Sequence, residues 1–279
     1  MSKCPSVKLY KYCDKFGLNI IRDKEIRLSK PMEFNDPFEL LPIIDDSEFT
    51  LEKVKTILKK ERFFLDWKKA KYPDKDEKEA SEIYVQSVDQ LATDRLEEIA
   101  AKKESIQWTY VETSSLGFLI TSFVQCNDSL LMWAHYADKH GGIVIEFDPT
   151  QQPFTIEPCL QVVKYRQERS VYRHVFDGDE KKMASQFFSI ASDKGEDWAY
   201  EKEVRFITPN YVSNIRDKRF LMIDPKLILS VTFGCRCPIE YRIEIGKLLK
   251  RPGFEHVKMF AASINPTKYA LDIYEIADG

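Results

Sequence analysis

The sequence predicts an α+β protein with a mixed, mostly antiparallel sheet at its core. Short segments with strand character lie near both ends of the chain, and two long amphipathic helical segments interrupt them. The later strand segments alternate with short helices, without the regular βαβ order of a parallel sheet. We therefore expect a single α+β domain over residues 1–279, with a helical insertion at about 48–112.

The composition is that of a folded globular protein. The chain has 279 residues, of which 43% are hydrophobic and 13% aromatic, and a disordered chain would be poorer in both classes. The formal net charge of -3 argues against a protein that coats duplex DNA, because such proteins carry a basic excess.

Membrane, disulfide and metal classes are disfavoured. The sequence shows no N-terminal signal peptide and no apolar run near the ~20 residues that a membrane-spanning helix needs. We therefore expect a soluble, cytoplasmic protein with no membrane contact. Six scattered cysteines argue against a disulfide framework. Cys235 and Cys237 form a close pair, but a zinc site would need a second pair or nearby histidines, so no metal is expected.

The regular elements follow from the hydrophobic periodicity. Strands are predicted over residues 8–12, 25–29, 117–123, 142–148, 160–166, 220–223, 227–233, 257–261 and 269–276. Helices are predicted over residues 50–71, 75–103, 130–140, 179–194 and 238–249. Thr50 and the run Asn127-Asp128-Ser129 are expected N-caps, and Gly141-Gly142 is expected to end the third helix. The sequence has no G-x-G-x-x-G, Walker A or G-x-S-x-G motif.

Two places outside the strands offer candidate binding residues. Asn35 and Asp36 precede Pro37, and this tripeptide favours a turn because both polar side chains bond to nearby backbone. The turn is either structural or a loop that closes over a ligand. On the helix at 130–140, His135 and Tyr136 share a face with Met132, and His135 could point into a site, although such a histidine is more often a satisfied core or cap residue.

The stretch 198–207 brings the most charge onto a predicted strand. If the pleat begins by Glu201, then Glu201, Glu203 and Arg205 share one face. A core face would not carry this trio, because unpaired buried charge is costly, so the face is either solvated or the wall of a polar cleft. These residues alone favour an ordinary exposed edge strand with an internal ion pair.

Three stretches together resemble the bacterial domain-of-unknown-function 2971 family. They are FNDPFE at 34–39, MWAHYA at 132–137 followed by HGGIVIEF at 140–147, and WAYEKEVR at 198–205. The segment LYKY at 9–12 also fits. The resemblance covers nearly the whole chain outside the helical insertion, and the family name carries no activity.

The layout is more loosely similar to ADP-ribosyltransferases, including the DNA-modifying toxins of that fold. Those enzymes place a basic or polar residue on a first strand, Ser or Thr on a middle strand, and Glu-x-Glu or a lone Glu on a later strand. The matching positions are Tyr10 or Lys11, Thr121-Ser122, and Glu201-Lys202-Glu203. The first position departs from the usual Arg or His. The resemblance implies the fold and an NAD-consuming activity of bacterial defence or toxin type, by analogy.

The resemblance also implies roles for these residues. Cleavage of the nicotinamide–ribose bond develops oxocarbenium-like charge, which Glu203 would stabilise. Glu201 would orient or deprotonate the acceptor, and Ser122 would position Glu203 or the ribose. The candidate NAD-contacting residues are Tyr10, Lys11, Asn35, Asp36, Trp133, His135, Tyr136 and Arg205. Aromatic members would stack on nicotinamide and the cationic ones would meet the pyrophosphate, while Arg205 could equally be an ion-pair partner of Glu203.

Two functions of different classes follow, with a third behind them. The first is an ADP-ribosyltransferase or NAD glycohydrolase with NAD as its substrate and an unknown acceptor, nucleic acid and protein both being open. The second is a non-catalytic module that binds a small ligand or a protein, in which the strand carboxylates form an ion-pair network. The third is metal-assisted hydrolysis of another nucleotide or a nucleic acid at the same acidic cleft.

Overall fold

The computed structural model describes residues 7–45, 47, 50–101, 117–156, 159–173, 180–209, 215–216 and 219–276. The chain divides into two compact units. The first comprises Met1–Glu39, Thr113–Glu168 and Ala191–Gly279, and the second comprises Leu40–Glu112 and Arg169–Ile190. The candidate residues named above all belong to the first unit. Within the described ranges, no helix is long and apolar enough to cross a lipid bilayer.

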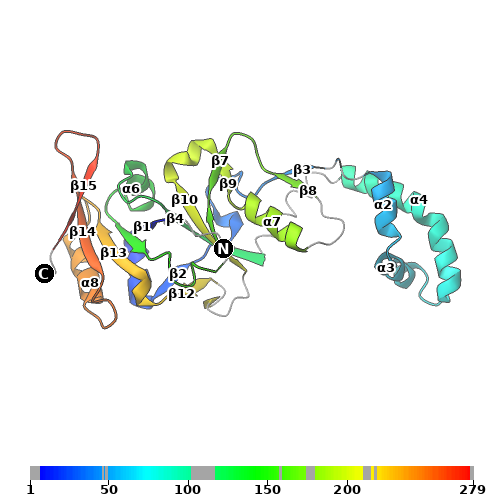
Figure 1. The fold of residues 1–279 in the computed structure, drawn as a ribbon, viewed down its shortest axis with the longest axis horizontal. Helices are drawn as coiled ribbons and strands as arrows, with labels where there is room; N and C mark the ends of the chain where they lie inside the picture. Colours follow the sequence, from blue (N-terminus) through cyan, green and yellow to red (C-terminus); the bar gives the residue numbers. More distant parts are fainter. Residues whose placement is uncertain are drawn as a thin grey trace. The chain divides into compact units, whose positions relative to one another are not determined.

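The predicted α+β class is confirmed, because a large mixed and mostly antiparallel sheet forms the first unit (Figure 1). The strand order is β15-β14-β13-β5-β1-β4-β10-β6, and β13 with β14 is its one parallel pair among the described residues. The strands are β1 (Leu9–Cys13), β4 (Phe118–Val124), β5 (Ile143–Phe147), β6 (Leu160–Val162), β10 (Glu203–Pro209), β13 (Ile228–Phe233), β14 (Lys258–Ile264) and β15 (Leu271–Glu275).

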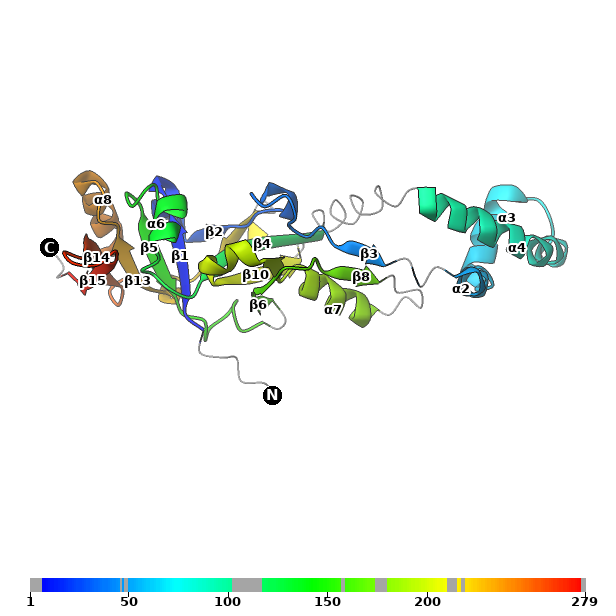
Figure 2. The ribbon, with the colours of Figure 1, turned by 90° about the horizontal axis from the view of Figure 1, so that it is seen from above.

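Helices cover both faces of this sheet. Buried residues of α1 (Leu18–Asp23) and α8 (Ile239–Leu249) join the larger apolar core. Met132 and Trp133 of α6 (Leu130–Tyr136) join a smaller cluster on the other face. Figure 2 shows α6 beside β1 and β5, and α8 beside β13 and β14. Alternate residues of β1 therefore enter different clusters, as the two-residue period of a strand requires.

Smaller elements complete the first unit. A three-stranded antiparallel sheet has the order β11-β12-β2, with β2 (Glu25–Arg27), β11 (Ile215–Arg216) and β12 (Phe220–Met222). The parallel pair β7 (Lys164–Arg166) and β9 (Asp193–Gly195) lies next in the chain to β6 and β10. Short 3-10 helices occur at Lys15–Gly17, Pro31–Glu33, Glu196–Glu201 and Pro225–Leu227.

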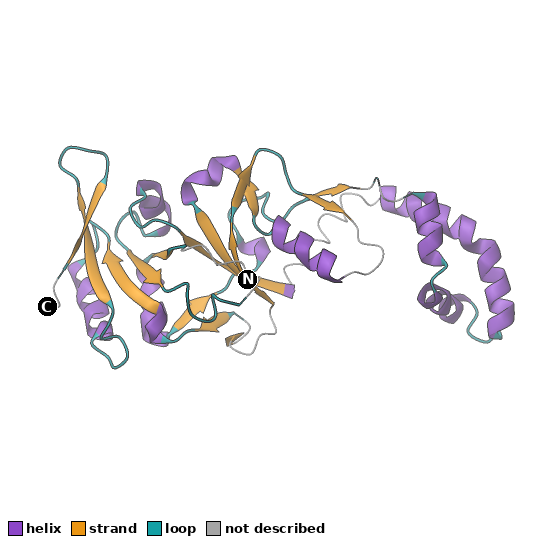
Figure 3. Ribbon diagram, viewed as in Figure 1, coloured by secondary structure: helices purple, strands orange, loops and turns teal. Residues whose placement is uncertain are grey.

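The second unit is largely helical (Figure 3). Its elements are β3 (Ile43–Asp45), α2 (Leu51–Leu58), α3 (Glu61–Lys71), α4 (Glu77–Ala101), β8 (Val171–Arg173) and α7 (Glu180–Ile190). Strand β3 pairs in parallel with β8. Val54 of α2 and Tyr84 and Val88 of α4 are buried, so the predicted apolar stripes form the contact between these helices.

Three predicted helices end elsewhere than expected, and the one predicted at 179–194 stops at Ile190. The helix expected at 50–71 begins after its Thr50 cap as predicted, but Lys60 is extended and divides it into α2 and α3. The Tyr84 hydroxyl donates to the carbonyl of Leu58 at 2.6 Å and so satisfies a backbone acceptor that the break exposes. The break lets Phe64 and Trp67 of α3 pack their rings on Tyr84.

The helix predicted at 130–140 is shorter than expected. It is capped by Ser129, as predicted, but it ends at Tyr136 instead of running to the glycine pair. Asp138, Lys139 and His140 have positive φ, so the chain leaves the helix through left-handed residues before Gly141. The Gly142 N–H then bonds the Ala137 carbonyl at 2.8 Å.

The prediction of an exposed edge strand at 198–207 is wrong. Strand β10 lies between β4 and β6, and the edge position belongs to the short β6. The relative exposures of Glu203 and Arg205 are 3% and 0%. The expectation that charge excludes a strand from the interior failed because partners elsewhere in the chain compensate these side chains.

Candidate functional site

A pocket of the first unit lies where the large sheet forks. Strand β1 pairs with β4 at one position, Tyr10 with Val124, whereas β1 pairs with β5 along its whole length. Farther along the same side of β4, Ser29 takes the place of β1 and pairs with Ile120. Between these two points β1 and β4 separate, because β1 stays paired with β5 and β4 stays paired with β10.

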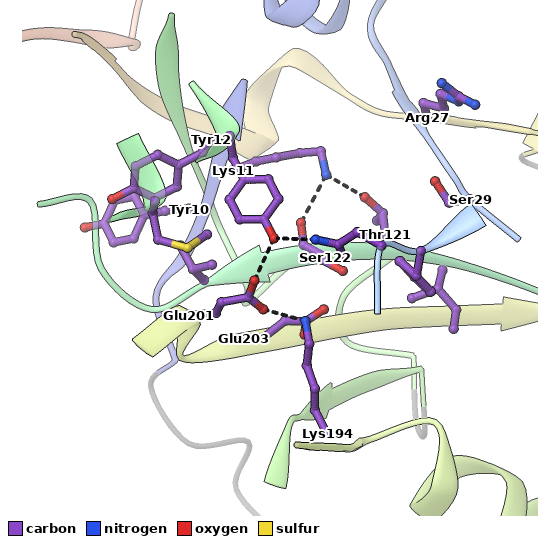
Figure 4. A pocket seen from close by; sticks show the side chains of 16 residues that line it. Tyr10, Lys11, Tyr12, Arg27, Ser29, Thr121, Ser122, Lys194, Glu201 and Glu203 are labelled. Carbon is purple, nitrogen blue, oxygen red and sulfur yellow. Dashed lines mark hydrogen bonds and ion pairs between the residues drawn. The ribbon is translucent and has the colours of Figure 1, made fainter. Parts of the chain in front are cut away.

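This fork holds a pocket of about 320 Å3 (Figure 4). Its lining is Tyr10, Lys11, Tyr12, Arg27, Ser29, Phe34, Asn35, Ile120, Thr121, Ser122, Val124, Met132, Tyr136, Lys194, Glu201 and Glu203. The volume is at the lower end of the range for small-molecule sites, which is enough for part of a nucleotide. The lining combines aromatic walls with a few convergent charges, as small-ligand sites do.

Lys11 bridges the fork. Its Nζ donates to Thr121 Oγ1 at 2.8 Å and to the Ser122 carbonyl at 3.0 Å. The second bond satisfies a backbone acceptor that a neighbouring strand would otherwise bind. Burial lowers the pKa of Lys11, and the nearby charge of Glu203 opposes that effect.

Glu203 and Arg205 form a buried, two-bond ion pair at the base of the pocket. Arg205 Nε and Nη2 donate to the two carboxylate oxygens of Glu203, each at 2.9 Å. Arg205 Nη1 donates to Glu39 and, at 2.8 Å, to the Ala191 carbonyl. Burial opposes ionisation of Glu203, but Arg205 and Lys194 outweigh it and lower its pKa to about 2. Glu203 is therefore a carboxylate, not a carboxylic acid, at neutral pH.

Glu201 faces the same pocket as Glu203 but belongs to a different secondary-structure element. It ends the 3-10 helix at Glu196–Glu201, and Lys202 then adopts a left-handed conformation with φ 46° before β10 begins. Lys194 Nζ lies 2.6 Å from Glu201 Oε2 and 3.3 Å from Glu203 Oε2, so one ammonium bridges both carboxylates. The Tyr136 hydroxyl donates to Glu201 Oε1 at 2.7 Å.

Counted by direct ion pairs, the buried charge cluster has more carboxylates than cations, and Lys11 lies near Glu203 without pairing with it directly. Three carboxylates, Glu39, Glu201 and Glu203, share two cations, Lys194 and Arg205. Burial raises the pKa of Glu39 despite its contact with Arg205, and repulsion from the Glu203 carboxylate adds to this effect. Glu201 and Glu203 face the pocket from this cluster (Figure 4). The acidic wall therefore favours a ligand group that carries or develops positive charge.

Seven of the predicted site residues line this pocket. They are Tyr10, Lys11, Asn35, Ser122, Tyr136, Glu201 and Glu203. Ser122 also lowers the pKa of Glu203 through a hydrogen bond. The Asn35 amide donates to the Tyr136 hydroxyl at 3.3 Å. The polar groups on β1, β4 and β10 meet because these three strands are neighbours in the sheet.

Four predicted binding residues lie outside the pocket lining. Trp133 is fully buried, and its Nε1 donates to the Asn127 carbonyl at 2.8 Å, so it is part of the core. Asp36 is buried and accepts from the Phe38 N–H at 2.9 Å, which makes it a turn residue. His135 is exposed on α6. Arg205 is beneath the pocket with its donors bonded to carboxylates and a carbonyl, so the ion-pair alternative describes it.

Several lining residues were not predicted. Lys194 was assigned to the end of a helix, and its place beside Glu201 follows from the turn at Gly195, which periodicity does not reveal. Arg27 and Ser29 were recognised as strand residues without a site role. Tyr12 had a signal, since it follows Tyr10 at the two-residue spacing of one strand face. Among the described residues, no group of three or more His, Cys, Asp or Glu is placed to hold a metal ion.

A family match covers the segment that carries α6, β5 and the Glu201–Glu203 turn. Residues 132–206 match a family model described as Protein of unknown function (DUF2971). The DUF2971 match confirms the recognised family over this segment. It includes Tyr136, Lys194, Glu201 and Glu203, which makes the acidic wall of the pocket part of the DUF2971 segment. No curated protein and no solved structure gives a significant match.

Tyr136→Phe tests the contact between α6 and the acidic wall. The change removes the hydrogen bond to the Glu201 carboxylate and the acceptor of the longer bond from the Asn35 amide, and it keeps the ring, so we expect a loss of about 1–2 kcal/mol in the free energy of unfolding, measured in urea. Tyr274→Phe, on the half-exposed face of β15, is the matched control and should change stability by less than about 0.5 kcal/mol. Equal stability of both variants would show that the bond to Glu201 contributes nothing.

Proposed function

We propose that the pocket binds NAD and cleaves its nicotinamide–ribose bond, as an ADP-ribosyltransferase or an NAD glycohydrolase. The observation that carries this proposal is the ionised Glu203 at the pocket wall, held by Arg205 and Lys194 with a pKa of about 2. Glycosidic cleavage develops positive charge on the ribose, and a fixed carboxylate beside that ribose lowers the barrier.

The neighbouring residues support the same chemistry. Glu201 is oriented by Tyr136 and Lys194, which suits a group that orients or deprotonates an acceptor. Tyr10 and Tyr12 supply rings on which a nicotinamide can stack. The order first strand, hydroxyl strand and Glu-x-Glu resembles ADP-ribosyltransferases, and these three parts lie on β1, on β4 and at the entry into β10, around one pocket. That resemblance also supports a place among bacterial defence or toxin enzymes.

A non-catalytic binding module is the second candidate. The observation in its favour is that all four carboxylate oxygens of Glu201 and Glu203 already accept bonds from Tyr136, Lys194 or Arg205. A fully bonded network of this kind rigidifies a protein without any catalytic role. In this case the pocket would bind a small ligand, and the acidic wall would only shape it.

One experiment separates the two candidates. The purified protein is incubated with NAD, alone and with a cell lysate that supplies acceptors, and released nicotinamide is measured by chromatography. Release above the protein-free control supports the enzyme, with water or a lysate component as the acceptor. The binding module predicts no release, and any ligand that it binds should raise the melting temperature steadily with the logarithm of the ligand concentration.

A further inference from the structure

The pocket has two chemically different ends. Glu203 and Tyr10 lie beside Val124 on β4, whereas Ser29 lies beside Ile120, four residues earlier on the same strand. Four residues of strand span about 13 Å. Figure 4 places Arg27 and Ser29 well apart from Glu201 and Glu203. One end of the pocket is therefore acidic, and the other carries a cation and a hydroxyl.

Donors continue along the floor between the two ends. An ammonium has three donors, and Lys11 uses two of them on Thr121 and Ser122. In the part of the chain that the structure describes, Lys11 makes no direct ion pair with a carboxylate. Backbone groups of a strand alternate between its two sides, so the Ser122 N–H points into the same gap as the bonded N–H of Ile120. An anionic group entering the fork would meet these donors.

Arg27 at the outer end is only loosely paired. Its Nη2 lies 3.7 Å from Glu33 Oε2, and its side chain is 63% exposed. A charge-assisted hydrogen bond measures about 2.7–2.9 Å, so this contact is too long to be one. Arg219 Nη2, by contrast, donates a hydrogen bond directly to Glu33. The Arg27 guanidinium can therefore turn toward a ligand without breaking a strong bond.

We propose that Arg27, with Ser29 and Lys11, binds a phosphate group of the ligand, so that the pocket selects nucleotides over the corresponding nucleosides. A planar guanidinium binds two phosphate oxygens at once, and the Ser29 hydroxyl adds a donor beside it. The inference rests on the proposed function, because the acidic end is assigned to the glycosidic bond. The phosphate then extends along β4 from the ribose toward Arg27.

Binding of inorganic pyrophosphate tests the anion subsite without any turnover. We expect calorimetry to show saturable binding to the wild type, and binding to Arg27→Gln that is at least about 10-fold weaker. The matched control is Arg22→Gln, because Arg22 is exposed, pairs with Asp23 at 3.0 Å and does not line the pocket. Absence of binding to the wild type, or equal binding to Arg27→Gln, would overturn the proposal.

A second measurement keeps this inference separate from the proposed function. If NAD is cleaved, the ratio of kcat/KM for NAD to that for nicotinamide riboside should fall about 10-fold in Arg27→Gln, through KM. An unchanged ratio would refute the phosphate contact and leave the glycosidic activity standing. If NAD is not cleaved but pyrophosphate binding depends on Arg27, the anion subsite stands and the proposed reaction falls.

Discussion

Glu203→Gln is expected to lower nicotinamide release from NAD by about 10²–10³-fold, the usual effect of removing one preorganised electrostatic group at a reacting centre. Glutamine keeps the shape of the side chain and removes its charge, so the loss reports electrostatic stabilisation. Because the pKa of Glu203 is about 2, the wild type should show no acidic limb from this group above about pH 4. A carboxyl group with an ordinary pKa would begin to lose activity there.

The fold of this variant should survive, because each cation keeps a carboxylate. Arg205 retains Glu39, and Lys194 retains Glu201. Glu275→Gln is the matched control, since Glu275 is exposed and pairs with Lys258 on the outer strands. A Glu203→Gln protein with the wild-type melting curve and undiminished nicotinamide release would remove Glu203 from the mechanism.

Arg205→Met is expected to destabilise the protein by about 3–5 kcal/mol, the range for breaking a buried ion pair by removing one partner. The change leaves Glu39 and Glu203 buried without the guanidinium that bonds both of them, and it also removes the bond to the Ala191 carbonyl. The measurement is urea unfolding of the wild type, Arg205→Met and the exposed control Arg22→Met. A loss below about 1 kcal/mol would show that the network is not a stability element.

The double variant Arg205→Met/Glu39→Gln shows whether uncompensated charge causes that loss. It removes one of the two carboxylates left without a guanidinium, so its unfolding free energy should lie above that of Arg205→Met. The stability deficit of Arg205→Met should also depend on pH in a defined direction. A buried carboxyl with a raised pKa favours the folded state as it protonates, so the deficit of Arg205→Met should shrink as the pH falls from about 8 to about 5. A pH-independent deficit would point to lost packing instead.

The sequence alone predicted the strands and helix caps that are determined by the residue pattern of a short stretch of chain. The strands β1, β4, β5 and β13 alternate or run apolar over short lengths, and each appears close to its predicted range. The glutamates were found because two carboxylates and a guanidinium in five residues are conspicuous on any strand. The Ser129 and Thr50 caps were found because a hydroxyl before an apolar stripe has a specific geometric role.

The parts that were missed depend on contacts far apart in the chain. Glu39 lies 166 residues from Arg205, and no local pattern indicates that it neutralises a buried guanidinium. The same holds for Lys11 and the β4 carbonyl, which are 111 residues apart. The break between α2 and α3 is fixed by Tyr84 on a later helix. Burial of the charged face was excluded at first because the cost of an unpaired charge was applied to charges that have partners.

The left-handed conformation of Lys202, and not strand alternation, brings the two glutamates of the Glu-x-Glu sequence together. In a continuous strand the two glutamates would share a face by alternation alone, whatever lay between them. Here a single residue at φ 46° turns the chain between them, and both carboxylates then meet one ammonium. A saturation library at position 202, selected for folded protein, should therefore enrich glycine and asparagine and deplete valine, isoleucine and proline. The middle residue of the motif therefore matters for its backbone conformation, which links the 3-10 helix to β10.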